Sequence, residues 1–558
     1  MPDPSAEIRE RACDWLILGP IVGFTTDAEV RVLAQPFEKH QGMLELRIAE
    51  AVEGVRFDHA RQGYGPVETL GPVRRFPVSE YGAYATAVFV VPGLDPDTRY
   101  FYEVVPEDAP LDVAGGFASR QPFSLRTLPR SPEAFKFSFH SCNGLHKPPR
   151  GGRPTDMWKR LLSEAVEDPE LHFALLGGDQ IYADVIREEW LREWGPDFDP
   201  SDPGRDQDLD AVDLARGMAF LEALPDRYER IYRAFWRRPE LRTFMGHVPC
   251  LMTWDDHDIY DGWGSCGDED KPAQRKFFEA AAGAFDAFQF ALAPKEPLSE
   301  AARCEREGHR AFSFMVGEVA FVVLDLRSQR NINSRTPSAV LGERQWAWFA
   351  AELAELERRK PRQVVVVSAV PVSHISGAVE YLVPNSTELH DDIVDHWSSR
   401  SNRNDQARLL GKLFRLRQAT GANVLLLSGD VHVGTVGEIL CDDPRFLLDG
   451  ESAARIHQGV SSAIAHEAPS GLTAHFVRYL VRGEHVLRNS FSGRVDEVVT
   501  ARNFSIVSVQ ANGAFRFNLF REGAEVPDQY YFSTQGGGGW SQRTSPAQDL
   551  FGGSGRPS

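Results

Sequence analysis

Short apolar runs that stop abruptly at glycine and aspartate constrain the fold of this chain more than any other feature. Residues 173–176 run through two glycines into Asp179, and residues 424–427 run through a serine and a glycine into Asp430. Such runs are typical of strands that are buried on both faces and end in a sharp turn. Other apolar runs and helical repeats alternate in the same way (strands at 135–139, 320–324 and 364–368, helices at 156–166 and 342–358). This alternation predicts a layered α/β domain over residues 131–535.

The chain before residue 131 has a different pattern. Short alternating segments separated by turns predict strands at 29–33, 43–48, 85–91, 99–105 and 123–126. Strands at this spacing indicate a small antiparallel β-sandwich, and residues 92–102 resemble the turn and strand of a fibronectin type III domain. We therefore expect an N-terminal extension at 1–13, a fibronectin III-like β-sandwich at 14–130, and a flexible Gly- and Ser-rich tail at 536–558.

Composition excludes several classes of function. The net charge of −19 disfavours binding to a nucleic-acid backbone, because no basic excess is present to replace counterions. No apolar run is long enough to predict a transmembrane segment. The six cysteines form no C-x-x-C pair, so a disulfide framework is not expected. The start of the sequence shows no signal peptide, which predicts a cytoplasmic protein, or an exported one if a signal has been removed. The sequence does not determine the oligomeric state.

An acidic stretch at 197–213 contains seven aspartates together with proline and glycine. This composition fits no regular element. A solvated surface insertion and a lid near the site are the two interpretations that remain open.

Three clusters of potential metal ligands follow apolar runs. Asp179 is the first, and Asp430 with His432 is the second; these two are separated by one residue, so in an extended chain their side chains point to the same side. The third cluster is Asp255-Asp256-His257-Asp258, whose carboxylates would repel one another without a cation. Each cluster alone could be an ordinary turn. Three of them at strand ends of one α/β domain indicate a shared metal site.

These clusters resemble conserved blocks of a known superfamily. Gly178-Asp179-x-x-Tyr182, Asp256-His257-Asp258 and Gly429-Asp430-x-His432 resemble those of the calcineurin-like metallophosphoesterases, and within that superfamily the alkaline phosphatase D (PhoD-like) family. Ser141-Cys142-Asn143, residues 324–327 and residues 341–346 look like further blocks of that family. The resemblance spans about 14–535, because family members also carry an N-terminal β-sandwich. It implies that residues 131–535 form a metallophosphoesterase catalytic domain.

The resemblance also implies a pair of metal ions, Fe³⁺ and Ca²⁺. Thiolate and anionic oxygen ligands suit a ferric ion, and a site with oxygen ligands alone suits calcium. The implied iron ligands are Cys142, Asp179, Tyr182 and His432, and the implied calcium ligands are Asp179, Asp256 and Asp430. Asp255 and Asp258 are candidates for additional or supporting ligands. Two simpler interpretations stay open: Cys142 could be a buried apolar residue, and Tyr182 could pack on the sheet.

The expected activity is hydrolysis of a small phosphoester, as an alkaline phosphatase or phosphodiesterase. In the mechanism that the resemblance implies, metal-bound hydroxide attacks phosphorus in line. His257 would stabilise the transition state or protonate the leaving oxygen. Arg327 and Asn143 are candidates for holding phosphoryl oxygens, although Arg327 could instead form an ion pair with Asp325 or a neighbour. His374 is either a pocket residue or a core histidine.

Two functions other than metal-dependent hydrolysis are less well supported by the sequence. A calcium-binding interaction protein with a degenerate hydrolase domain would predict missing ligands, whereas all the expected positions are filled. A hydrolase that uses Cys142 as nucleophile is poorly supported, because the sequence has no G-x-S-x-G motif and assigns no base to that cysteine.

Overall fold

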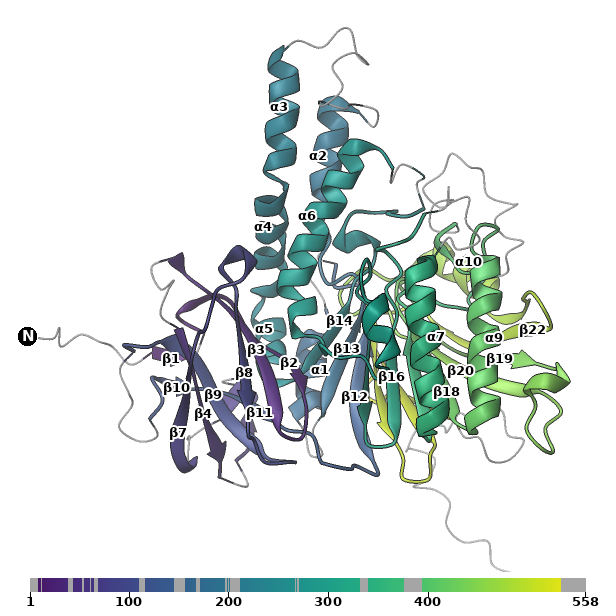
Figure 1. Ribbon diagram of the computed structural model, residues 1–558, viewed down its shortest axis with the longest axis horizontal. Coiled ribbons are helices and arrows are strands. Elements are labelled where there is room, and N and C mark those ends of the chain that lie inside the picture. Colours follow the sequence, from purple (N-terminus) through teal and green to yellow (C-terminus); the bar gives the residue numbers. More distant parts are fainter. Residues whose placement is uncertain are drawn as a thin grey trace, which may run out of the picture.

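The computed structural model describes residues 9–532 apart from fifteen gaps (12, 39–43, 53–54, 61, 65–68, 110–115, 145–155, 167–170, 196–197, 199, 201–210, 266, 268–269, 332–339 and 376–393). A small β-sandwich at the N-terminal end packs beside a larger pair of sheets, and a group of helices rises above both (Figure 1). The tail expected at 536–558 and most of the acidic stretch at 197–213 lie outside the described residues.

The N-terminal sandwich consists of two antiparallel sheets. One sheet has the order β2-β3-β8 and the other β11-β9-β4-β7, and their inward-facing apolar side chains share one core. The strands are β2 (Leu16–Thr25), β3 (Glu29–Pro36), β4 (Leu44–Ala51), β7 (Thr69–Pro77), β8 (Ala87–Pro92), β9 (Arg99–Pro106) and β11 (Phe123–Arg126). Two short pairs accompany them, β1 (Arg9–Arg11) with β10 (Ser119–Gln121) and β5 (Phe57–Asp58) with β6 (Gly63–Tyr64).

Two mixed sheets form the centre of the larger domain. The six-stranded sheet has the order β14-β13-β12-β23-β24-β25, in which β12, β13 and β14 are parallel. Phenylalanine, valine and leucine side chains from its strands and from the second sheet fill one shared core. Its strands are β12 (Phe135–His140), β13 (Phe173–Gly177), β14 (Cys250–Thr253), β23 (Asn503–Val509), β24 (Phe515–Arg521) and β25 (Asp528–Phe532).

The second sheet has eight strands in the order β15-β16-β17-β18-β20-β19-β22-β21. Its strands β16, β17, β18 and β20 are parallel, and β17 and β18 are buried along their whole length. The strands are β15 (Phe312–Val316), β16 (Val319–Val323), β17 (Gln363–Val367), β18 (Asn423–Ser428), β19 (Gly434–Cys441), β20 (Ala454–Val460), β21 (Gly483–Val486) and β22 (Phe491–Val499).

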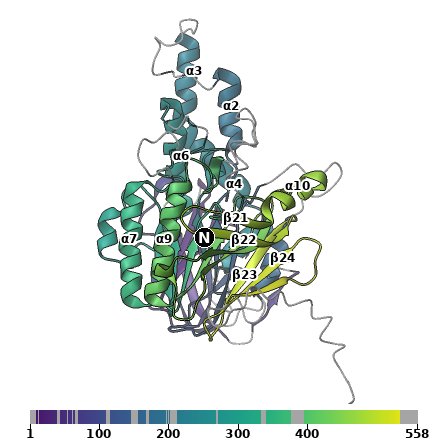
Figure 2. The same ribbon diagram turned by 90° about the vertical axis from the view of Figure 1, so that its right-hand side faces the viewer.

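Helices cover the outer face of each sheet. α7 (Gly342–Arg359) and α9 (Arg403–Thr420) pack on the eight-stranded sheet. The six-stranded sheet is covered by α1 (Trp158–Val166), α5 (Pro239–His247) and the lower ends of a helical projection. That projection rises away from the sheets (Figure 2) and consists of α2 (Asp184–Trp194), α3 (Ala211–Glu222), α4 (Leu224–Trp236) and α6 (Pro272–Phe288). α10 (Gly471–Val481) lies near the C-terminal strands.

The layered α/β architecture with a preceding antiparallel β-sandwich is confirmed. Within the described part of the chain, no helix combines the length and the apolar character needed to cross a membrane.

Candidate metal centre

The proposed ligands meet at the carboxyl ends of parallel strands from both central sheets. Cys142 follows β12 and Asp179 follows β13, each two residues beyond the strand end. Asp256 follows β14, and Asp430 follows β18 of the opposite sheet. Open α/β sheets present ligands at this edge, because the turns after neighbouring strands lie side by side. Motifs that are 288 residues apart, such as those of Cys142 and Asp430, therefore come into contact.

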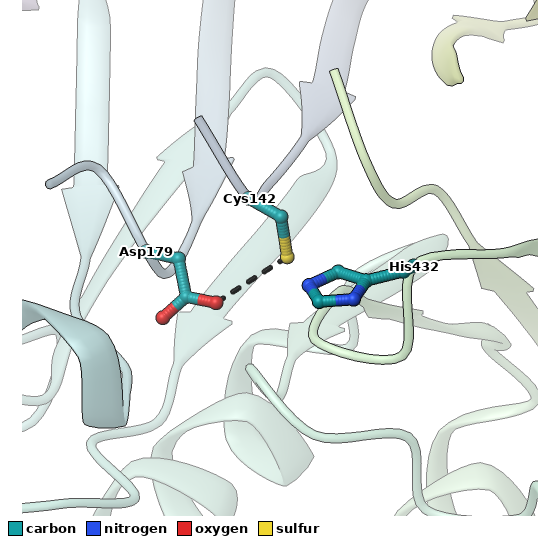
Figure 3. Close-up of side chains that lie close together, drawn as sticks. All are labelled: Cys142, Asp179 and His432. Atoms are coloured by element: carbon teal, nitrogen blue, oxygen red, sulfur yellow. Dashed lines mark hydrogen bonds between the residues drawn. The ribbon is translucent and has the colours of Figure 1, made fainter. Parts of the chain in front are cut away.

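The first group of potential ligands combines sulfur, carboxylate and imidazole. Cys142, Asp179 and His432 each place one ligand atom within 4.8 Å of the others, and all three side chains point toward one another (Figure 3). Sγ of Cys142 lies 3.3 Å from Oδ2 of Asp179. Cys142 is fully buried and His432 is half-buried, so this group opens toward solvent on the histidine side.

The second group consists of carboxylates alone. Asp179, Asp255, Asp256 and Asp430 bring oxygens within 4.8 Å of one another, and a third combination joins Asp179, Asp256 and His257. Asp179 belongs to all three combinations. The arrangement offers potential ligands to two adjacent cations that would share one carboxylate, with a soft ligand on one side and hard oxygen ligands on the other.

The burial and the chemistry of these groups suit a bound cation. Oδ1 of Asp179 and Oδ2 of Asp255 are buried and accept no hydrogen bond from any described residue. Burial raises the pKa of Asp179 and of Asp430 well above the ordinary value, and neighbouring carboxylates raise both further. Burial and the same carboxylates raise the pKa of the Cys142 thiol. Buried anions are stable only when paired or coordinated, so the donor set fits bound metal ions.

Tyr182 lies beside both the carboxylate and the imidazole of the first group. Its hydroxyl is 3.5 Å from Oδ2 of Asp179 and 3.5 Å from Nε2 of His432. Its ring stacks on His257 and His466. The phenol oxygen thus faces the same space as the sulfur of Cys142, which is the position expected of a further ligand.

The backbone itself is unusual at four of the proposed ligands. Cys142, Asp179, Asp430 and His432 have φ angles of 57°, 56°, 67° and 54°. Residues other than glycine rarely adopt this left-handed conformation, and such residues cluster at functional sites. Backbone hydrogen bonds hold it in place, because the amides of Cys142 and Asn143 donate to the carbonyls of Gly178 and Asp179 at 3.2 and 2.9 Å.

The glycines before these aspartates permit close packing, as their positions in the motifs predict. Gly178 has a φ of 110°, and a Cβ there would lie 2.7 Å from the Cβ of Asp255. A Cβ on Gly429 would lie 2.5 Å from the Cβ of Ser141. Any larger residue at either position would push neighbouring ligand loops apart.

His257 is held by a carboxylate at the rim of the site. Nδ1 of His257 lies 2.8 Å from Oδ1 of Asp184, which also accepts the amide of Asp261 at 2.7 Å. Burial alone would lower the pKa of His257, but the carboxylates of Asp184, Asp256 and Asp179 raise it well above the ordinary value. The contact with Asp184 fixes the orientation of the imidazole and directs its other nitrogen away from Asp184.

Arg327 is fully buried behind the carboxylate group. Its guanidinium donates to Asp255 and Asp256, to both oxygens of Asp395 (2.7 and 2.9 Å), and to the carbonyl of Trp263. These bonds use all five of its donors. The ion pair considered from the sequence is thus present, but with Asp255 and Asp395 in place of Asp325. In this arrangement Arg327 positions the carboxylates of Asp255 and Asp256 and partly neutralises their charge.

Three other proposed residues are engaged in the scaffold. Asn143 donates from Nδ2 to the carbonyl of Gln180 at 3.0 Å, and its Oδ1 accepts from Trp158 and Arg238. Oδ2 of Asp258 accepts three backbone amides, including that of Asp255, and its Oδ1 accepts the side chain of Gln289, so both its oxygens are engaged by the scaffold. His374 is buried with its ring 5.5 Å from that of His396, and it belongs to none of the ligand combinations in the described residues.

Sequence reasoning missed four residues around the site. Asp184 lies two positions beyond Tyr182, where its spacing could have suggested a partner for the histidine. Asp395 and His466 have no motif that would mark them. Ser462 donates from Oγ to Sγ of Cys142 at 3.0 Å, and the ring of His466 stacks on His432 with centroids 3.6 Å apart. None of these residues directly follows a predicted apolar strand, so no apolar run precedes them as a signal.

Comparison with known proteins agrees with this arrangement. The family model of the PhoD-like phosphatases matches residues 137–509, which is more than half of the chain. The chain belongs to the PhoD-like phosphatase family. The matched region contains every proposed ligand, and the sandwich lies before it.

Individual relatives of this PhoD-like chain are distant. A solved structure of PhoD superimposes with a TM-score of 0.61 over 98% of this chain and 94% of that one, at 13% identity, which establishes a shared fold. An uncharacterized protein of Saccharomyces cerevisiae, YGR266W, is 24% identical over 323 residues. That match covers 48% of this chain and 45% of the yeast protein, so it spans about half the length of its curated relative.

Proposed function

We propose that this PhoD-like protein is a metal-dependent phosphoester hydrolase that acts on small phosphomonoesters or phosphodiesters. The single observation that supports this most is the convergence of Cys142, Asp179 and His432 beside Asp255, Asp256 and Asp430, with Asp179 common to both sets. Membership of the PhoD-like phosphatase family supports the same activity.

We propose that the ion beside the sulfur is ferric iron and that its neighbour is calcium. The first would be held by Cys142, Asp179, Tyr182 and His432, a set of soft and anionic donors. The second would be held by Asp179, Asp256 and Asp430, which offer oxygen alone. Asp255 is close enough to contribute as well, although one of its oxygens is already paired with Arg327.

Bound cations of this kind supply Lewis acidity, which lowers the pKa of a coordinated water and stabilises charge on phosphoryl oxygens. The protein residues supply the rest. His257, whose Nδ1 is held by Asp184, is placed to donate a proton to the leaving oxygen. Arg327 keeps Asp255 and Asp256 in fixed positions. The ring of Phe235 stacks on Tyr182 and helps to fix its orientation.

The test is to purify the protein, measure its metal content, and record its visible spectrum together with its hydrolysis of p-nitrophenyl phosphate and of the bis ester. A ferric ion bound by thiolate or phenolate gives a visible charge-transfer band. We expect that band, bound calcium, and activity that a chelator removes. A colourless protein whose activity resists chelation would overturn the proposal.

Substitutions at Cys142 and Tyr182 test whether these residues produce the charge-transfer band. We expect Cys142→Ala to remove or shift it and Tyr182→Phe to shift it. The matched control is Cys250→Ala, because Cys250 is equally buried on β14 but belongs to no ligand group. An identical spectrum in all three variants would contradict the ligand assignment. Metal binding without any ester hydrolysis would instead favour a calcium-binding interaction protein.

A further inference from the structure

α10 carries an exposed apolar face that the proposed hydrolase chemistry does not use. Leu472, Phe476 and Tyr479 have 87%, 54% and 82% of their surface exposed. Their spacing of four and three residues places them on one side of the helix. Monomeric proteins tolerate scattered exposed apolar residues, but a continuous stripe of large ones marks a binding surface.

The opposite side of α10 is anchored to the protein. Ala474 and Val481 are buried, and Val477 and Leu480 pack against a cluster that includes Val433. α10 therefore has two apolar sides, one packed in the core and the other exposed to solvent. In Figure 2 it lies at the outer edge of the molecule, on the side opposite to α7.

The charges on α10 itself are basic. α10 contains no aspartate or glutamate, whereas Arg478 in its last turn and Arg482 just after it are both exposed. This local balance contrasts with a chain whose net charge is −19. Apolar and aromatic side chains beside arginines are the composition of helices that lie in the interface of an anionic bilayer.

The size of the stripe also favours a lipid surface over a protein partner. A helix of eleven residues is about 16 Å long. Its three exposed side chains offer less area than the roughly 800 Å² that each partner buries in a stable protein interface. Shallow insertion into a bilayer needs no complementary groove and can act through a few side chains with electrostatic support.

We propose that the exposed face of α10, formed by Leu472, Phe476, Tyr479, Arg478 and Arg482, binds the surface of an anionic lipid bilayer. α10 begins five residues after His466, which stacks on His432. A bilayer bound there would lie close to the candidate metal centre, so phosphoesters at the lipid surface would reach the site. This last consequence depends on the proposed hydrolase activity, whereas binding to the bilayer does not.

The test is co-sedimentation of the full chain with vesicles of equal parts phosphatidylcholine and phosphatidylglycerol, and with vesicles of phosphatidylcholine alone. We expect binding to the mixed vesicles, weakened more than about a hundredfold by the triple substitution Leu472→Glu, Phe476→Glu and Tyr479→Glu. The double substitution Arg478→Gln and Arg482→Gln should weaken binding to the mixed vesicles about thirtyfold and leave binding to pure phosphatidylcholine unchanged.

The control carries the same change of charge on other faces, at Leu70→Glu, Val90→Glu and Met218→Glu, whose side chains are also exposed. It should bind vesicles within a few-fold of the wild type. Hydrolysis of p-nitrophenyl phosphate should be equal in all these proteins, because none of the changed residues contacts the metal centre. An equal loss of binding in control and α10 variants would overturn the proposal. So would a wild-type dimer that only the α10 variants dissociate, since a second copy would then cover the face.

Discussion

The positive φ angles at Cys142, Asp179, Asp430 and His432 show how single residues are aimed at the site. An ordinary side chain in this conformation is strained by about 1–2 kcal/mol, because Cβ crowds the following carbonyl. The surrounding hydrogen bonds hold each residue there, and the ligand atoms converge as a result. Strain at these positions is therefore part of how the protein builds the site, and it should be measurable.

The strain can be measured at Asp430, because a left-handed backbone favours glycine over alanine, whereas a helical backbone favours alanine. At an ordinary helical position, alanine gives the more stable protein by about 0.5–1 kcal/mol. At a φ of 67° we expect Asp430→Gly to be the more stable variant, by about 1 kcal/mol. Urea unfolding of the metal-stripped variants measures the difference.

The control is the same pair of substitutions at Glu189, an exposed residue in the helix α2. There alanine should be the more stable variant. The same order at both positions would show that Asp430 is not strained.

The hydrogen bond from Ser462 should tune the electronic properties of the Cys142 sulfur. Its hydroxyl donates to Sγ of Cys142 at 3.0 Å and would stabilise the lone pairs of a bound thiolate. If iron binds as proposed, Ser462→Ala should move the visible charge-transfer band to longer wavelength. Ser461→Ala is the matched control, because that hydroxyl donates to Asn503 instead. A shift of equal size in both variants would contradict a specific role for Ser462.

At the scale of elements, apolar runs predicted the strands well. Residues 320–324, 364–368 and 424–427 correspond to β16, β17 and β18 within a residue or two, because a strand buried on both faces leaves an unbroken apolar signature. Candidate ligands directly after such strands, such as Asp179 and Asp430, were predicted in the same way. Asp395 and Ser462 follow no predicted apolar strand, so they carried no such signature and were missed.

The structural roles of Asp258 and Arg327 could not be read from sequence for a related reason. Whether a carboxylate next to a ligand faces a metal or a backbone amide depends on the turn that follows β14. Asp258 turns toward the amides of Asp179 and Asp255 at 2.9 and 3.0 Å, which are contacts across two different strand ends. No periodicity within either segment encodes such a contact.

His140, the last residue of β12, is expected to make the stability of the protein sensitive to acid. His140 is fully buried against Trp158, and burial lowers the pKa of His140 to about 3. Its unfolded pKa is about 6.5, so the unfolded chain binds the extra proton first as the pH falls. Above about pH 6.5, His140 therefore costs the folded state nothing. Below that pH it lowers the free energy of unfolding progressively, by about 2 kcal/mol at about pH 5.

His140→Phe should remove this contribution. Urea unfolding at about pH 8 and about pH 5 should show a smaller loss of stability for the variant than for the wild type, by about 2 kcal/mol. His475→Phe, at an exposed histidine, should keep the wild-type dependence. An unchanged pH dependence in His140→Phe would mean that this imidazole is protonated equally in both states.

At the scale of the whole molecule, the sandwich and the catalytic part are joined through α5. Arg242 donates to the carbonyls of Gly19 and Leu16 at 2.8 and 2.9 Å, and Tyr102 donates to the carbonyl of Gly246 at 2.6 Å. Leu18 and Ile21 of β2 belong to the core that also covers the six-stranded sheet. The sandwich was predicted from its strand spacing, but this docking was not, because its partners are more than a hundred residues apart.

Shared packing predicts that both parts unfold together. Calorimetry should give one transition, and Arg242→Met should lower the unfolding free energy by about 2–3 kcal/mol, because buried carbonyls lose a charged donor. Arg237→Met, at an exposed arginine of the same region, should change it by less than about 0.5 kcal/mol. Two well-separated transitions in the wild type would show that the sandwich unfolds independently.

The position of Asp179 in every ligand combination has a consequence for how metal ions are taken up. A carboxylate that has been oriented by one ion no longer has to be ordered when the second ion arrives. The two binding events are then linked, and the free energy of that coupling must be the same whichever ion binds first. Titration with either ion should therefore give a higher affinity when the other is already present, by the same factor for both ions. In Asp179→Asn, each ion that still binds should do so as if the other were absent.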